Sequence, residues 1–178
     1  ENNRYRNGKF VFGTRNDYDE NLVVGNISQK TAEQPNYESR IRIKWYNGLY
    51  NPVYYVKDGT ENVVCLWSYS GEYPIAEIKN ATMDDVLKAL GQEQGDLAYF
   101  TTLAKQTVPD MTPINSLRAK LPDAQVWTYT YKSLVGMLTA TDPAGKTAYY
   151  DYDSFGRLTG MRDNDGNTIQ SFDYHYKQ

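Results

Sequence analysis

Two kinds of side chain in this sequence could do chemistry, the carboxylates and the aromatic rings. The aspartates of interest lie late in the chain, at Asp151, Asp153, Asp163, Asp165 and Asp173. Two carboxylates at a defined separation are what a glycosidase needs, and an oxygen-rich loop can bind calcium. These aspartates, however, recur at equivalent turn and strand positions, where Asp accepts hydrogen bonds from its own backbone. The segment 163–167 also lacks the later bidentate glutamate of a calcium loop. We therefore expect structural aspartates, with no catalytic residue, no metal site and no cofactor.

The single cysteine and the single histidine limit the remaining chemistry. Cys65 lies among apolar neighbours, which is typical of a buried thiol on a strand. His175 is far away at the end of the chain, so neither a Cys–His pair nor a zinc site is expected. The sequence contains no phosphate-binding loop and no nucleophile elbow. We expect a protein that is not an enzyme, and a carbohydrate-active enzyme is the less favoured alternative.

Aromatic residues form the second candidate site. The chain has 17 Tyr, 5 Phe and 3 Trp, and rings on strands can either stack on sugars or pack as cross-strand ladders. Packing is the favoured reading for any one ring, whereas an exposed row would indicate a surface that binds carbohydrate or another protein. The candidate binding residues are Trp45, Trp67, Trp127, Tyr129 and Tyr131.

Charge and hydropathy restrict the possible partners. A net charge of −3 gives no electrostatic basis for binding nucleic acid or an anionic membrane. No apolar run has the length of a transmembrane segment. The first residue is Glu rather than Met, so we expect that a leader or an upstream region was removed.

Strand-like alternation organises most of the chain. Ile41, Ile43 and Trp45 share one face of the first clear strand. Segment 63–69 is apolar on both faces, which favours a central strand. Residues 1–36 are polar and predict irregular structure, with one short strand at 9–12 and a loop from 28 to 38. The other predicted strands are 52–57, 73–78, 126–131 and 147–152, and a hairpin spans 150–161.

Residues 82–121 change to helical periodicity and predict three short helices. Thr82 is the expected N-cap of the first helix, and Asp96 that of the second. Thr112, followed by Pro113, is the expected N-cap of the third. Their apolar stripes predict packing on the sheet, and a partner-binding groove is the alternative.

The strands form a repeat. Tyr131, Tyr152 and Tyr174 are spaced by 21 and 22 residues, and Tyr46 and Tyr69 by 23. Turn signals recur between them, as at Asp142–Gly145 and Asp163–Gly166. The expected fold is mainly β, an antiparallel sheet of repeated Tyr-Asp hairpins with a short three-helix insertion packed on it. We expect one domain, 1–178, made of a polar segment 1–40, degenerate repeats 41–80, the insertion 82–121 and repeats 126–178.

The motif Tyr-Asp-Tyr-Asp-Ser-Phe-Gly-Arg-Leu at 150–158, the turn 163–167 and the start of a further unit at 172–174 resemble the RHS/YD-repeat family. With segments 67–78 and 121–137, they resemble the C-terminal region of secreted YD-repeat proteins of Bacteroidetes-type bacteria. The resemblance implies a structural or interaction module of a secreted or cell-surface protein, and association through sheet edges is open. An alternative is the scaffold of a polymorphic-toxin shell. Four or five repeats are too few for a closed shell.

Overall fold

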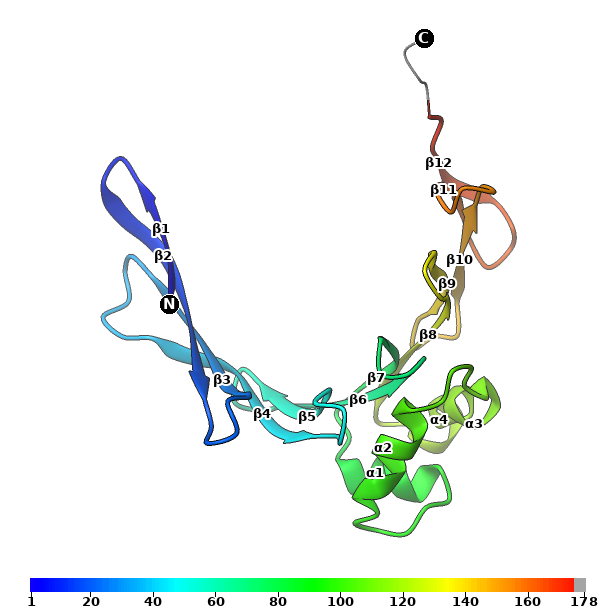
Figure 1. Ribbon diagram of the computed structural model, residues 1–178, viewed down its shortest axis with the longest axis horizontal. Coiled ribbons are helices and arrows are strands. Elements are labelled where there is room, and N and C mark those ends of the chain that lie inside the picture. The colour runs from blue at the N-terminus through cyan, green and yellow to red at the C-terminus, as the bar shows by residue number, and fades with distance from the viewer. Residues whose placement is uncertain (175–178) are drawn as a thin grey trace.

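The computed structural model describes residues 1–174, and these form one curved antiparallel sheet with helices on its convex side (Figure 1). Twelve strands pair in strict sequence order, so each strand lies beside its neighbours in the chain. The predicted mainly β fold with a helical insertion is confirmed. The strands are β1 (Asn2–Arg6), β2 (Lys9–Tyr18), β3 (Val24–Thr31), β4 (Glu38–Tyr46), β5 (Pro52–Lys57), β6 (Glu61–Ser68), β7 (Tyr73–Lys79), β8 (Gln125–Lys132), β9 (Gly136–Thr141), β10 (Thr147–Tyr152), β11 (Leu158–Arg162) and β12 (Thr168–Ser171).

The prediction of irregular structure over residues 1–36 is wrong. β1, β2 and β3 form there, and β4 begins at Glu38 rather than at Ile41. The β1–β2 turn uses Asn7 and Gly8, both with positive φ, which is the geometry that a two-residue hairpin requires. β1 is exposed along its whole length. Polar strands carry no clear hydrophobic alternation, and these strands are specified by pairing and turns instead.

The helices lie between β7 and β8 and are α1 (Met83–Ala89), α2 (Leu97–Ala104), α3 (Met111–Asn115) and α4 (Leu117–Lys120). Thr82 caps α1 in a capping box, and Asp96 caps α2, as predicted. The third predicted helix consists of two short pieces, α3 and α4. Its N-cap is Asp110 rather than Thr112, because the Asp110 carboxylate accepts a hydrogen bond from the Thr112 amide. Within residues 1–174, no helix is both long enough and apolar enough to span a bilayer.

The hydrophobic core lies between these helices and strands β6 to β8. Val64, Leu66 and Ile78 from the sheet pack there with Phe100 and Leu117 from the helices, and all five are almost completely buried. Each such side chain contributes about 1.5–3 kcal/mol through removal from water. The apolar helical stripes therefore pack on the sheet, as predicted. β6 is the most buried strand, which agrees with its predicted central place.

Arg118 of α4 ties the insertion to the sheet. Its guanidinium donates hydrogen bonds to the Thr128 hydroxyl at 2.7 Å and to the carbonyl oxygens of Thr141 and Asp142, both at 3.0 Å. Burial lowers the pKa of Arg118 from its ordinary value. Three acceptors on β8 and at the end of β9 therefore fix the position of the last helix.

The strict strand order places successive turns on alternating rims of the sheet. We call the rim with the turns after β2, β4, β6, β8 and β10 the even rim, and the opposite one the odd rim. The same type of five-residue turn occurs on both rims. Its first residue accepts amide hydrogen bonds through its side chain, and its fourth residue has positive φ. The first residues are Asp19, Asn47, Asp142, Asp153 and Asp163.

Candidate interaction surface

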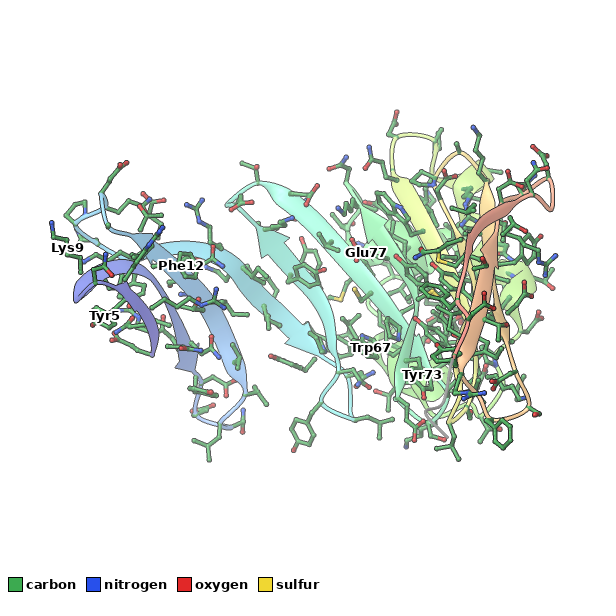
Figure 2. The ribbon with its side chains drawn as sticks, turned by 90° about the horizontal axis from the view of Figure 1, so that it is seen from above. Tyr5, Lys9, Phe12, Trp67, Tyr73 and Glu77 are labelled. Carbon is green, nitrogen blue, oxygen red and sulfur yellow. The ribbon has the colours of Figure 1, made fainter. Side chains whose placement is uncertain are left out.

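The five predicted binding residues do not form one row. Trp45 on β4 packs on the helical side, with its ring centroid 5.7 Å from that of Phe100 on α2. Direct cross-strand partners share a face of a sheet. Val64 pairs with Ile78 on the helical face, whereas Cys65 pairs with Glu77 on the opposite, concave face. Figure 2 looks into this concave side.

Trp127 and Tyr129 belong to the concave face. Trp127 pairs across the strands with Glu77, and the ammonium group of Lys79 lies 4.9 Å from its ring centroid. Lys79 and Glu77 are 3.6 Å apart and half-buried. Burial, followed by the charge of Glu77, raises the pKa of Tyr129 to about 12. This part of the surface is therefore a partly exposed aromatic patch with one cation and one anion.

Trp67 and Tyr131 are held by neighbours near the even rim. The Trp67 indole nitrogen donates a hydrogen bond to the Pro52 carbonyl oxygen at 2.8 Å. Tyr131 stacks on Tyr73 with ring centroids 4.5 Å apart, and it meets Tyr69 edge to face at 5.8 Å. Burial raises the pKa of Tyr131 to about 12. Both residues are thus partly used in internal packing.

Three of the five aspartates have structural contacts, and two of them, Asp153 and Asp163, cap turns as expected. The Asp153 carboxylate accepts hydrogen bonds from the Phe155 and Arg157 amides, and the backbone hydrogen bond from Arg157 is the main cause of its lowered pKa. The Asp163 carboxylate does the same in its own turn, and its hydrogen bond with Asn167 lowers its pKa. Asp151 instead forms a two-pronged ion pair with Arg162 on the next strand, at 2.7 and 2.8 Å.

Metal-ligating side chains do not gather in the described residues. Among residues 1–174, no group of three or more His, Cys, Asp or Glu side chains could hold a metal ion. The Asp163 carboxylate oxygens are directed at the Asp165 and Asn167 groups of their own turn. His175, the only histidine, lies outside the described residues.

A contact between successive repeats was missed by the sequence reasoning. The Tyr152 hydroxyl donates to the Met137 carbonyl oxygen at 2.9 Å, and the Tyr174 hydroxyl donates to that of Leu158, also at 2.9 Å. Met137 lies six residues after Tyr131, and Leu158 lies six residues after Tyr152. Each tyrosine therefore binds the preceding unit at the same register.

The same register recurs in the N-terminal half. The Tyr46 hydroxyl donates to the Val24 carbonyl oxygen at 2.7 Å, and Val24 lies six residues after Tyr18. Pro52, the acceptor for Trp67, lies six residues after Tyr46. Segment 18–27 therefore belongs to a structural unit of the same kind. We call this recurring hydroxyl- or indole-to-carbonyl hydrogen bond the staple.

One family model supports the repeat. Residues 134–168 match the family model described as RHS Repeat. The solved structures that resemble the chain include a crystal structure of TcdB2-TccC3-TEV, with a TM-score of 0.45 and 16% identity over 94% of this chain and 8% of that one. They also include a structure of the Photorhabdus luminescens Tc holotoxin pore, with a TM-score of 0.41 and 13% identity over 92% of this chain and 8% of that one. The chain thus spans less than a tenth of these structures. Comparison with curated proteins gives no match.

Proposed function

We propose that this chain is a non-enzymatic structural segment of an RHS-type scaffold in a secreted or cell-surface protein. The observation that carries the proposal is the staple, which recurs at four junctions between successive units at a fixed register. Such contacts make stability a property of neighbouring units, as in other repeat arrays. The RHS Repeat match at 134–168 supports the same reading. The scaffold of a polymorphic-toxin shell is the special case that a longer array would favour.

The geometry of the curved sheet, which we call the wall, suits a scaffold. Within the described residues, β1 and β12 each pair with one strand only and lie at the two ends of the arc (Figure 1). An unpaired strand edge presents amide and carbonyl groups to which a further strand can add. The proposed role is therefore extension of a curved wall, strand by strand, with the helices on its outer side.

Deletion of one complete unit tests the scaffold. Removing residues 132–152 takes out two strands and joins β8 directly to the turn before β11, which preserves strand direction and the staple register. We expect the shortened chain to fold and to unfold cooperatively at a lower urea concentration. Removing residues 142–152 takes out a single strand, reverses the direction of β11, and should leave segment 153–174 unprotected in hydrogen exchange. Equal disruption by both deletions would argue against a modular scaffold.

Ligand binding by the concave aromatic patch is the second candidate. The partly exposed Trp127 ring beside Lys79 supports a surface for carbohydrate or a protein partner. The change Trp127→Ala should abolish binding on a glycan array, whereas Trp45→Ala, on the opposite face, should leave binding intact in folded protein. Wild-type protein that binds no glycan would remove the carbohydrate candidate and leave the scaffold proposal standing.

A further inference from the structure

The most exposed large apolar side chains of the described residues gather along the even rim. Five such side chains are at least 70% exposed, and in residues 1–174 the next most exposed is Tyr5 at 63%. Four of the five are at the tips of even-rim turns, and the fifth is in the loop after α2. They are Leu22 (81%), Tyr50 (70%), Val108 (79%), Leu134 (95%) and Phe155 (82%).

Val108 provides an exposed apolar side chain beside the one even-rim turn that has none of its own. The turn after β6 comprises residues 69–72 and presents no large apolar residue to solvent, because Tyr69 is buried there. The Ser70 amide donates a hydrogen bond to the Gln106 carbonyl oxygen at 2.9 Å. This contact brings the loop that carries Val108 to the same rim. All five even-rim positions thus have an exposed apolar residue at or beside the turn.

Three of these residues occupy a backbone conformation that favours glycine. Leu22, Tyr50 and Leu134 have φ values of 60°, 61° and 63°. Gly156 has the equivalent position in the turn after β10, with φ 75°. The left-handed conformation costs roughly 1–2 kcal/mol for a side chain with a Cβ. A large apolar residue that is at least 70% exposed there gains little from burial, which is the pattern expected where function overrides local preference.

The spacing of the tips decides what they contact. Adjacent strands lie about 4.8 Å apart, so successive even-rim turns are separated by about 10 Å along the arc. The other residues of these turns are mostly polar and separate the exposed apolar side chains, so these side chains do not form a contiguous patch. A protein partner would need separate pockets at matching intervals, whereas a fluid lipid surface accepts isolated apolar side chains at any spacing. Leu, Val and Phe suit the acyl boundary, and Tyr suits the headgroup level.

The charge of the even rim indicates which class of lipid it could bind. Acidic side chains outnumber basic ones in these turns, so attraction to anionic lipid is not expected. The charged residues of the even-rim turns are Asp19, Glu20, Glu72, Asp153 and Arg157, and Lys132 ends the strand before one of these turns. We propose that the even rim is a docking surface for a neutral phospholipid bilayer, inserting the side chains at positions 22, 50, 108, 134 and 155 to the depth of the headgroups. The inference is independent of the scaffold role.

Vesicle sedimentation with matched variants tests this proposal. The full chain should co-sediment with phosphatidylcholine vesicles, with little change between about 0.05 and 0.5 M salt because the attraction is apolar. The double change Leu134→Ser with Phe155→Ser should lower the partition coefficient at least about tenfold. Val11→Ser with Ile169→Ser removes two exposed apolar residues elsewhere and should leave the partition coefficient unchanged. Circular dichroism serves as the control that both variants are folded.

A labelled tip gives a second measurement. Burial raises the pKa of the Cys65 thiol to about 12, so this thiol does not compete for alkylation in the folded protein. An environment-sensitive dye at Leu134→Cys should shift to the blue on vesicle addition, whereas the same dye at Ala144→Cys, on the odd rim, should not. Absence of wild-type binding, equal shifts at both positions, or self-association lost in the tip variant without vesicle binding would each overturn the proposal.

Discussion

Removal of the Tyr152 hydroxyl tests whether the staple stabilises the array. The hydroxyl is partly buried and donates to the Met137 carbonyl oxygen at 2.9 Å. Tyr152→Phe deletes this hydrogen bond and leaves the ring in place. We expect a loss of about 1 kcal/mol in the free energy of unfolding. Tyr149→Phe is the matched control, because that ring is 37% exposed and contacts the Arg162 guanidinium through its face. Its expected effect is below about 0.3 kcal/mol.

A double-mutant cycle that combines Gly136→Ala with Tyr152→Phe extends this test. A Cβ on Gly136 would lie 2.5 Å from the Tyr152 hydroxyl oxygen and 3.1 Å from the ring carbon that carries it. Gly136→Ala should therefore cost about 1–3 kcal/mol through overpacking, plus backbone strain at φ 152°. In the Tyr152→Phe background the closest clash is absent, so the same change should cost about 1 kcal/mol less.

Urea unfolding followed by circular dichroism measures all four proteins, and hydrogen exchange of β9 amides shows where the loss acts. Two results would refute the reasoning. One is a Tyr152→Phe effect equal to that of Tyr149→Phe. The other is strict additivity of the Gly136→Ala and Tyr152→Phe changes, which would show that the hydroxyl and the glycine do not share one site.

Three further predictions concern a turn, the insertion and the rim. A backbone hydrogen bond lowers the Asp153 pKa below its ordinary 3.8, so the stability that this interaction adds is present above that pH and is lost as pH falls through the lower folded-state pKa. The urea concentration at the wild-type unfolding midpoint should therefore decrease between about pH 5 and about pH 3. The decrease should be less steep in Asp153→Asn. Arg118→Ala should cost about 2–3 kcal/mol in urea unfolding, whereas exposed Lys105→Ala should cost little. Tyr50→Gly should raise stability by up to about 1 kcal/mol while weakening vesicle binding, and unchanged binding would contradict the proposed role of that tip.

The C-terminal repeats were predictable because their turns use residues with a single structural meaning. Asp142 and Gly145 occupy the first and fourth positions of a turn in which one accepts amide hydrogen bonds and the other has positive φ. The N-terminal turn after β2 keeps Asp19 at the first position but has Leu22 at the fourth. The glycine signal is missing there, and so the strands on either side were not recognised. Asn7 with Gly8 was a valid hairpin signal that the prediction overlooked.

The candidate site was less predictable than the fold. Alternation assigns Trp45 and its neighbours to faces of their own strand, but it does not say which face the insertion covers. Irregular register between β4 and β5, on both sides of Trp45, further weakens the transfer of faces from strand to strand. The contact with Phe100 and the packing of Trp45 against the core show that Trp45 lies on the helical side. The staple acceptors are main-chain groups, which no side-chain pattern reveals directly.

The insertion shows how the array tolerates a change in its connections. β7 and β8 pair in register across it, with Ala76 opposite Thr128. The staple register would place the Tyr131 partner at Ile75, six residues after Tyr69, but Tyr131 stacks on Tyr73 instead. The Tyr131 amide donates to the Tyr69 hydroxyl at 3.1 Å, which joins the two units by a different hydrogen bond. Because stacking and the Arg118 hydrogen bonds act at this junction, the sheet continues without interruption. Insertions of this kind can therefore add an outer layer to the wall without altering the register of the units on either side.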